Sequence, residues 1–353
     1  MKSILNSPLS TISDKPTSHK SSQAVIYGDM LKQSNINIDI NYNGELTNHN
    51  NYDSMYVYHG NDWSGTLNLF GGAEGYCNGY KFTNLVNFSN FKGKVYSLGI
   101  DFPPYHELIQ NKIKNVSDDI KKIWSSVDMD NLKRMYDTSE KIVFPNITNK
   151  LILGDSHSIC MYRPGWTIHS IPFKTLNGAL DIGLENLIRQ VAPLNEIDEL
   201  ELYFGNIDIR HHLCRYDGYL SGFEKGLHSE TKTKELIKKY VNDVKRLPIK
   251  KVSIYEPLPI EDESRKIPKS GFYKGKPFWG SWEERNNCRE LFRDELIKNA
   301  DRVEVILWTD YLLNDKKQLD FRHMEKPQSV HLSRSSYPYW TGDSMNTLEN
   351  FME

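Results

Sequence analysis

Three polar clusters follow apolar runs in the second half of the chain, and they contain residue types that can carry out chemistry. Ser156 lies in the first cluster, residues 154–157. The second cluster is residues 205–212, and His331 lies in the last, within QSVHLS. A serine hydroxyl is a weak nucleophile near neutral pH, and it becomes reactive when a histidine within hydrogen-bonding distance accepts its proton. These two residues are therefore a candidate nucleophile and general base for attack on an acyl carbon. In the alternative interpretation, Ser156 or Asp155 only caps the helix that follows.

Apolar runs and amphipathic segments predict how these clusters are positioned. Five runs predict buried strands: KLILGD, WTIHSIPF, IDELELYFGN, KKVSIYEPLP and DRVEVILWTDYLL. Three segments between them have the three-to-four apolar spacing of helices that cover a sheet: GALDIGLENLIRQVAPL, TKTKELIKKYVNDVKRL and WEERNNCRELFRDELIKNA. The alternation predicts an α/β domain over residues 147–345, with a five-stranded parallel sheet and helices on both faces. Because the carboxyl ends of parallel strands share one edge, the three clusters should converge there.

The clusters, taken in this order, resemble the blocks of the SGNH/GDSL hydrolase family over about residues 147–345. Gly154-Asp155-Ser156 matches the first block, with Ser156 in the position of the nucleophile, and His331 matches the histidine of the last block. The resemblance implies a flavodoxin-like three-layer α/β/α fold. It also implies the activity of a serine-dependent esterase, lipase, carbohydrate deacetylase or acyltransferase. The N-terminal half has no counterpart in this resemblance.

The resemblance further implies an oxyanion hole. Gly178 best matches the glycine of the second block, whereas in the third block Ile207 stands where the family has its asparagine, and Asn206 lies one residue early. The candidate donors are the backbone N–H groups of Ser156 and Gly178 and the side chain of Asn206. Removing one such donor typically lowers the rate about 100- to 1000-fold. If the loop is shifted by one residue, the Asn206 amide faces the oxyanion; in the ordinary register Ile207 faces the pocket and backbone N–H groups act alone.

The last block departs from the family at Gln328, which occupies the position of the acid that orients the histidine. An uncharged residue in such a position lowers the rate about 10,000-fold in a serine protease. Three alternatives follow. Glu325 or Asp320 reaches His331, or a backbone carbonyl orients His331 in a Ser-His dyad, or the site is a degenerate binding pocket.

Charged and histidine residues near the clusters also have structural interpretations. Asp208 and Arg210 either form an ion pair that fixes their loop or clamp an anionic group of the substrate. His157, His211 and His212 lack the carboxylate spacing of a metal site, so we interpret them as loop histidines and expect no metal.

The first half of the chain has a different texture, and its role is open. Residues 1–23 are rich in Ser, Thr, Pro and Lys and predict a flexible tail, and residues 346–353 are taken as a C-terminal tail. Residues 24–146 are expected to form a smaller α/β domain from three β-like runs: AVIYGD, DSMYVYHGND and GKVYSLGIDFPP. The stretch YHGNDWSGTLNLFGGAEGY suits a sugar or nucleotide pocket, but no phosphate-loop or dinucleotide motif occurs, so we expect no cofactor.

Composition and charge narrow the classes of partner. The 353 residues include 44 Lys and Arg against 46 Asp and Glu, and a formal charge of −2 provides no global field for nucleic acid. The four cysteines show no C-x-x-C spacing, which disfavours a zinc knot or a disulfide framework and indicates the cytoplasm. No apolar run approaches the roughly 18 residues that span a bilayer, so we expect no membrane partner. The sequence does not indicate an oligomeric state.

We therefore predict a cytoplasmic, metal-independent serine esterase, acyl hydrolase or acyltransferase. Its expected partner is a small-molecule substrate, plausibly an acylated carbohydrate or a nucleoside-like molecule. Two rival functions remain at this point. One is a catalytically degenerate binding protein with the SGNH fold, and the other is a transferase whose active site lies in the N-terminal half.

Overall fold

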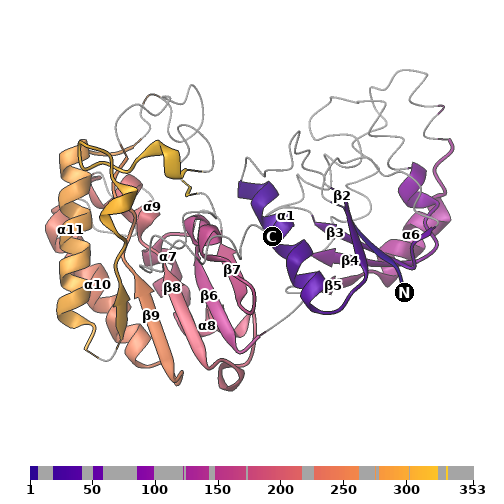
Figure 1. Cartoon of the computed structure of the whole chain (residues 1–353), viewed down its shortest axis with the longest axis horizontal. Coiled ribbons are helices and arrows are strands. Elements are labelled where there is room, and N and C mark those ends of the chain that lie inside the picture. Colours follow the sequence, from indigo (N-terminus) through magenta and orange to yellow (C-terminus); the bar gives the residue numbers. More distant parts are fainter. Residues whose placement is uncertain are drawn as a thin grey trace. The chain divides into compact units, whose positions relative to one another are not determined.

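The computed structural model of the chain divides into two compact units, Met1–Asn146 and Ile147–Glu353, and each unit contains its own sheet (Figure 1). The residues that the structure describes are 1–6, 19–41, 51–58, 86–98, 122, 125–142, 148–171, 174–216, 226–261, 275, 278–301, 303–324 and 331–332.

The first unit is built on a five-stranded sheet with the order β2-β1-β3-β4-β5, in which all neighbouring strands are parallel. The strands are β1 Ser3–Asn6, β2 Ile38–Asn41, β3 Ser54–Tyr58, β4 Lys94–Leu98 and β5 Glu140–Ile142. The helices that the structure describes in full are α1 His19–Gln33 and α6 Met129–Thr138.

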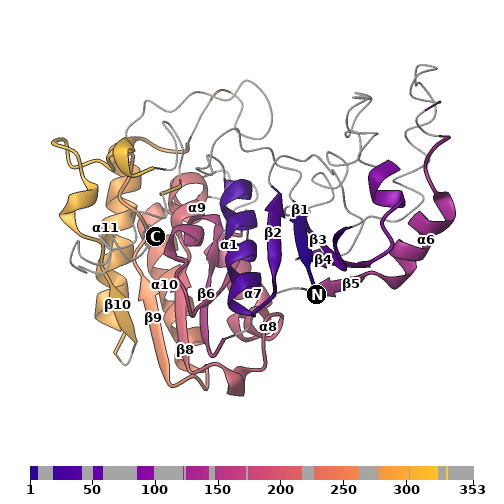
Figure 2. The same cartoon turned by 45° about the vertical axis from the view of Figure 1, so that its right-hand side comes forward.

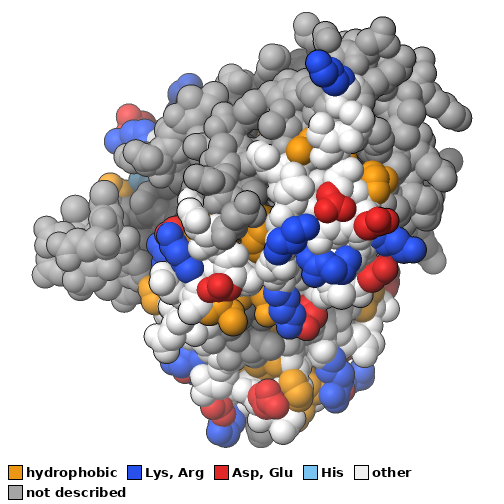
Figure 3. All heavy atoms as spheres, turned by 90° about the vertical axis from the view of Figure 1, so that its right-hand side faces the viewer, with side chains coloured by type: hydrophobic (Ala, Val, Ile, Leu, Met, Phe, Trp, Pro, Cys, Tyr) orange, Lys and Arg blue, Asp and Glu red, His pale blue; other side chains and the backbone are white. Residues whose placement is uncertain are grey.

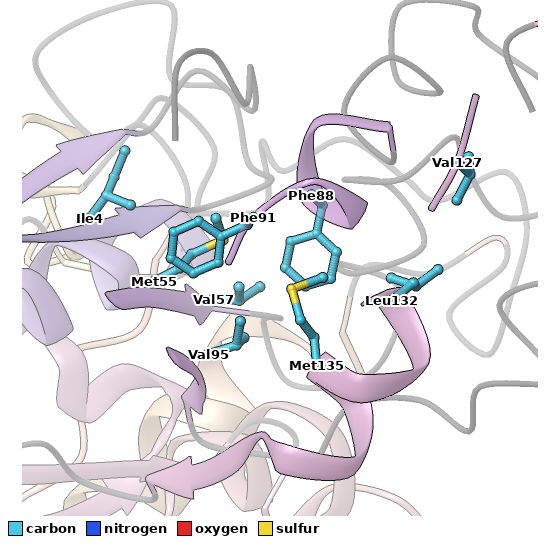
Figure 4. Packing of buried hydrophobic residues seen from close by; sticks show 9 residues of the cluster. All are labelled: Ile4, Met55, Val57, Phe88, Phe91, Val95, Val127, Leu132 and Met135. Atoms are coloured by element: carbon cyan, nitrogen blue, oxygen red, sulfur yellow. The ribbon is translucent and has the colours of Figure 1, made fainter. Parts of the chain in front are cut away.

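Both faces of this sheet are buried, as the alternation of side chains along a strand allows. Met55 and Val57 of β3 belong to one hydrophobic cluster with Phe88, Phe91 and residues of α6 (Figure 4). Tyr56 and Tyr58 point to the other face, where they pack with residues of α1 and β2. A parallel sheet with buried residues on both faces belongs to the α/β class.

Two predictions for the first unit need correction. Residues 3–6 of the predicted flexible tail form the interior strand β1, whose Ile4 and Leu5 are buried and which lies between β2 and β3. The run AVIYGD, expected to be a strand, lies inside helix α1. Its Ile26 and Tyr27 are buried together with Met30 and Leu31, the three-to-four spacing of one helical face. The Gly- and Asn-rich stretch after β3 and residues 346–353 lie outside the described residues.

The second unit contains the five predicted strands in a parallel sheet with the order β10-β9-β8-β6-β7. They are β6 Lys150–Asp155, β7 Thr167–Ile171, β8 Glu199–Tyr203, β9 Lys251–Tyr255 and β10 Glu304–Ile306. The predicted α/β fold class is thereby confirmed. Counted from β6 in chain order, the strands follow the flavodoxin order 2-1-3-4-5, so the winding of the sheet reverses between β6 and β8.

The predicted amphipathic segments of this unit all form helices. The α-helices are α7 Leu176–Ile182, α8 Leu184–Arg189, α9 Asn206–Asp208, α10 Ser229–Lys245 and α11 Trp282–Asn299. Short 3₁₀ helices are η2 Ser156–Met161, η3 Leu194–Glu196, η5 Asp310–Leu312 and η6 Phe321–His323, and η4 Ile209–Leu213 is a π-helix. α10 packs against both α7 and α11 (Figures 1 and 2). α11 begins with a capping box in which Ser281 and Glu284 bond each other's backbone N–H.

The surface carries charges of both signs. On the face shown in Figure 3, basic and acidic side chains of the described residues lie intermixed. Examples of exposed ion pairs are Lys2–Asp39, at 2.9 Å, and Lys94–Glu140, at 2.6 Å. Within the described part of the chain, no helix is both long and apolar enough to cross a bilayer.

Candidate active site

The candidate site lies where the winding of the second sheet reverses, at the carboxyl ends of β6 and β8. Ligands of open α/β sheets bind in the crevice at such a point. Ser156 follows β6 directly as the first residue of η2, and Gly205 follows β8 within two residues. Both turns depend on glycine. A Cβ on Gly154 would lie 2.4 Å from the backbone oxygen of Tyr203, and Gly205 has a φ of +104° in close contact with Phe292.

Ser156 and His331, which are 175 residues apart, meet at this point. His331 Nε2 lies 3.0 Å from Ser156 Oγ, within hydrogen-bonding distance. Both residues are partly exposed. An antiparallel bridge between Met324 and Leu332 joins the segment of His331 to the preceding chain. The arrangement is that of a serine whose proton a histidine can accept.

Asp155 caps the turn that carries the serine. Its Oδ1 accepts hydrogen bonds from the backbone N–H of His157, at 2.8 Å, and lies 2.8 Å from His157 Nδ1. The ring of His157 is inclined by 54° to that of His331, with 4.9 Å between the ring centroids. Burial raises the pKa of Asp155 to about 7, opposed by the hydrogen bond from His157 and by the positive charges of Arg210 and His331. Sequence reasoning considered Asp155 only as a helix cap and His157 only as a loop histidine.

Asn206 is fully buried at the end of β8. Its Oδ1 accepts a hydrogen bond of 2.8 Å from the backbone N–H of Leu258, which joins the ends of β8 and β9. Its Nδ2 makes no hydrogen bond of good geometry to any described residue, but the amide lies near enough to Asp155 to lower the pKa of that carboxyl. Ile207 is partly exposed. The structure thus gives Asn206 a definite structural contact, and its predicted role at the oxyanion stays a prediction.

Gly178, the other predicted donor, uses its N–H as a helix cap. The Gly178 N–H donates to Thr175 Oγ1 at 2.9 Å, at the start of α7. The Ser156 N–H occupies the first position of η2, where a helix offers no internal acceptor. Of the two predicted backbone donors, we therefore retain that of Ser156.

Asp208 and Arg210 each have a partner other than the one that the sequence suggested. The Asp208 carboxylate accepts the backbone N–H groups of Leu176, at 2.6 Å, and Asn177, at 3.2 Å, and so fixes the start of α7. Burial raises the pKa of Asp208 to about 7. Arg210 forms a two-pronged ion pair with Glu261, and both side chains are only 1% exposed. These contacts serve to fix the loop, and Glu261 was missed by sequence reasoning.

The predicted partners of His331 fall into two groups. Asp320 caps η6 and binds Arg322, with 2.7 Å between Oδ2 and Nη2. Glu325 and Gln328 lie outside the described residues. Among the described acidic side chains, Asp155 is one whose pKa the charge of His331 lowers.

The remaining histidines of the second cluster are packing residues. His211 stacks on the ring of Phe278, with 5.9 Å between centroids. Burial lowers the pKa of His212 to about 4, and the charges of Arg215 and Lys232 add to the effect. No group of three or more His, Cys, Asp or Glu side chains suited to a metal occurs among the described residues.

Comparison with known proteins extends the resemblance noted from the motifs. No family model matches the sequence, and no curated protein matches it. Among solved structures, a protein described as a platelet activating factor from Streptococcus pneumonia is 17% identical with a TM-score of 0.38, over 59% of this chain and 85% of its own. A GDSL-like lipase from Bacteroides thetaiotaomicron is 15% identical with a TM-score of 0.37, over 57% of this chain and 87% of its own.

A third similar structure is described as an SGNH hydrolase from Slackia heliotrinireducens. It is 13% identical with a TM-score of 0.33, over 58% of this chain and all of its own. SGNH/GDSL hydrolases are thus structural neighbours of part of the chain, as the motifs predict, and the remainder stays unrecognised. All three TM-scores are below 0.5.

Proposed function

We propose that this protein is a serine-dependent acyl hydrolase or acyltransferase in which Ser156 is the nucleophile and His331 the general base. The observation that supports the proposal is the distance of 3.0 Å between Ser156 Oγ and His331 Nε2 at the reversal point of the sheet. A bare cap would not require a histidine from the far end of the domain to approach the hydroxyl. The competing proposal of a degenerate binding pocket has no comparable contact in its favour.

The proposed reaction proceeds through an acyl-enzyme. Ser156 Oγ attacks the acyl carbon, its proton passes to His331 Nε2, and the carbonyl electron pair becomes an oxyanion next to the Ser156 N–H. Collapse of this intermediate breaks the bond to the leaving group, which takes the proton from His331. Water or an acceptor hydroxyl then attacks the acyl-enzyme in the same way, giving hydrolysis or transfer respectively.

The proposed substrate is an ester or amide of a small polar molecule, plausibly an acylated carbohydrate or a nucleoside-like compound. The sequence feature behind this choice is the stretch 58–76 of the first unit, whose glycines and polar residues suit a sugar or nucleotide pocket. Acetylated sugars, acetylated nucleosides and simple p-nitrophenyl esters should be compared as substrates, each with and without an added sugar acceptor. Appearance of acylated acceptor would assign transfer, and release of free acid alone would assign hydrolysis.

The deciding experiment is labelling of the folded protein with a fluorophosphonate, which bonds to an activated serine oxygen and releases fluoride. We expect the label on the peptide that contains Ser156, and we expect Ser156→Ala to abolish both labelling and ester turnover. Loss of one partly exposed oxygen should lower the free energy of unfolding by about 1 kcal/mol at most.

A neighbouring serine provides the matched control. Ser158 is buried, and its hydroxyl donates to the backbone oxygen of Asp155 at 2.8 Å, so it has a structural hydrogen bond of its own. Ser158→Ala should still be labelled at Ser156. If the wild-type protein stays unlabelled while a known serine esterase reacts under the same conditions, the assignment of the nucleophile is wrong and the binding-protein alternative takes its place.

A further inference from the structure

A fully buried carboxylate lies beside the nucleophile and is linked to the base through a second histidine. We propose that Asp155, held in place by His157, is the positioning carboxylate that stabilises the positive charge on His331 during the reaction, in place of the acid that Gln328 lacks. The inference rests on the proposed function, because it assigns a role to groups around the same pair.

Two polar contacts and one contact between imidazole rings lie in succession from the carboxylate to the hydroxyl. Asp155 Oδ1 lies 2.8 Å from His157 Nδ1, the His157 and His331 rings are 4.9 Å apart, and His331 Nε2 is 3.0 Å from Ser156 Oγ. The hydrogen bond from the His157 backbone N–H, also 2.8 Å, holds Asp155 Oδ1 from a second direction. With one oxygen held by the backbone N–H and in contact with the ring of the same histidine, the carboxylate keeps its place when the charge on His331 develops.

The environment makes this charge effective. Asp155 is 0% exposed and His157 is 3% exposed, so water screens the charge of Asp155 less than it would on the surface. The charge of His331 acts on Asp155, since it is one of the influences that lower the pKa of this buried carboxyl. The path differs from that of an ordinary triad, since an imidazole lies between the carboxylate and the base.

Other groups that face Asp155 come from four further elements. Arg210 of η4 contributes a positive charge and Asn206 of α9 contributes an amide, and both lower the pKa of Asp155. Tyr203 of β8 and Tyr240 of α10 lie near enough for Asp155 to raise the pKa of their hydroxyls. Asp208 of α9 carries a second negative charge nearby, and Asp155 raises its pKa. Only a variant that removes the Asp155 charge and keeps its shape isolates the effect on His331.

Asp155→Asn is that variant, because an amide oxygen can still accept the His157 N–H. We expect kcat to fall about 10- to 100-fold, less than the roughly 10,000-fold for a carboxylate bonded directly to the base. We expect KM to change little. The acidic limb of the kcat/KM profile should move to lower pH by roughly half a unit or more, since protonating the base is less favourable without a nearby negative charge. Loss of a cap alone would not move this limb.

Glu256→Gln is the matched control. Glu256 is also a buried carboxylate whose pKa burial raises to about 7, but the charged groups acting on it are Arg289, Arg293 and Asp294, which lie outside the site. We expect its acidic limb to coincide with that of the wild type. A second test is His157→Asn, whose amide can donate to Asp155 but removes the ring against His331. It should shift the limb in the same direction by a smaller amount, and it keeps the proposal testable if Asp155→Asn does not fold.

The outcomes separate this inference from the proposed function. If Asp155→Asn and His157→Asn fold, are labelled by the fluorophosphonate at Ser156, and keep the wild-type kcat and acidic limb, the role of Asp155 is refuted while Ser156 remains the nucleophile. If the wild-type protein itself is not labelled, the proposed function fails and this inference fails with it.

Discussion

The ion pair between Arg210 and Glu261 joins the loop after β8 to the chain after β9, and its removal should measure how strongly the site is held. Arg210 Nε and Nη2 reach the carboxylate at 2.9 Å and 2.8 Å, and both side chains are 1% exposed. Removing one partner of a buried pair leaves an uncompensated charge and typically costs about 3–5 kcal/mol. Glu261→Gln keeps one acceptor oxygen, so we expect the free energy of unfolding to fall by about 3 kcal/mol.

Urea unfolding followed by tryptophan fluorescence is a suitable assay. Five of the seven tryptophans lie in the second unit, at positions 166, 279, 282, 308 and 340, so the signal reports mainly on the unit that contains the pair. Midpoint and slope must both be fitted, because a change of slope would indicate a changed unfolded state instead of a lost contact.

An exposed pair on the same unit supplies the control. Arg189 and Glu185 are 2.7 Å apart at positions i and i+4 of a helix, with side chains 53% and 51% exposed. Such pairs contribute about 0–1 kcal/mol, so Glu185→Gln should be nearly silent.

The double variant Arg210→Met with Glu261→Leu tests whether the loss of stability comes from an uncompensated buried charge. Because it removes both charges together, it should destabilise the protein by much less than the sum of the two single changes. If Glu261→Gln costs less than about 1 kcal/mol, as little as the surface control, the pair is hydrated in solution and the assumed desolvation is refuted.

Two further predictions concern Gln328 and Asn206. Gln328→Asp should raise esterase activity and move the acidic limb of the pH–rate profile to higher pH if residue 328 lies beside His331, because a new carboxylate favours the protonated base; a profile unchanged in height and limb would mean that another group already orients the ring. Asn206→Ala removes the acceptor of the buried Leu258 N–H, so the free energy of unfolding should fall by about 1–3 kcal/mol in urea titrations, and a loss below about 0.5 kcal/mol would contradict the anchoring role. Steady-state kinetics on the same variant assigns the amide, since a fall in kcat of about 100-fold or more with constant KM places it at the oxyanion, whereas an unchanged kcat leaves the oxyanion to backbone N–H groups.

Local sequence patterns were sufficient to predict the strands of the second unit, because strand formation depends mainly on neighbouring residues. The five apolar runs of the second unit became β6 to β10, and their parallel arrangement follows from helices between consecutive strands. Shared strand ends then bring Ser156 and His331 together, as the structure shows. The prediction of a strand at AVIYGD was wrong because a short apolar run is compatible with a buried helix as well as with a strand. Here the run is part of the 15-residue helix α1. The prediction of a flexible tail was wrong for residues 3–6 because the polar residues around them dominated the composition. These four residues form a strand that pairs with a neighbouring strand on each side.

The sequence did not predict which groups the charged side chains would pair with, because pairing depends on which side chains lie together in the folded interior. Arg210 pairs with Glu261, 51 residues away, and not with Asp208, two residues away, whose carboxylate instead holds the start of α7. The link between Asp155 and His157 did have a local signal, an aspartate two residues before a histidine at the start of a turn, and this spacing allows a capping hydrogen bond. No local sequence signal indicated that His157 would approach His331. The sequence therefore determined the strands, the order of the chemical residues and the meeting of Ser156 with His331. Tertiary packing alone decided which charges are buried beside these two residues, because burial and dielectric are properties of the assembled fold.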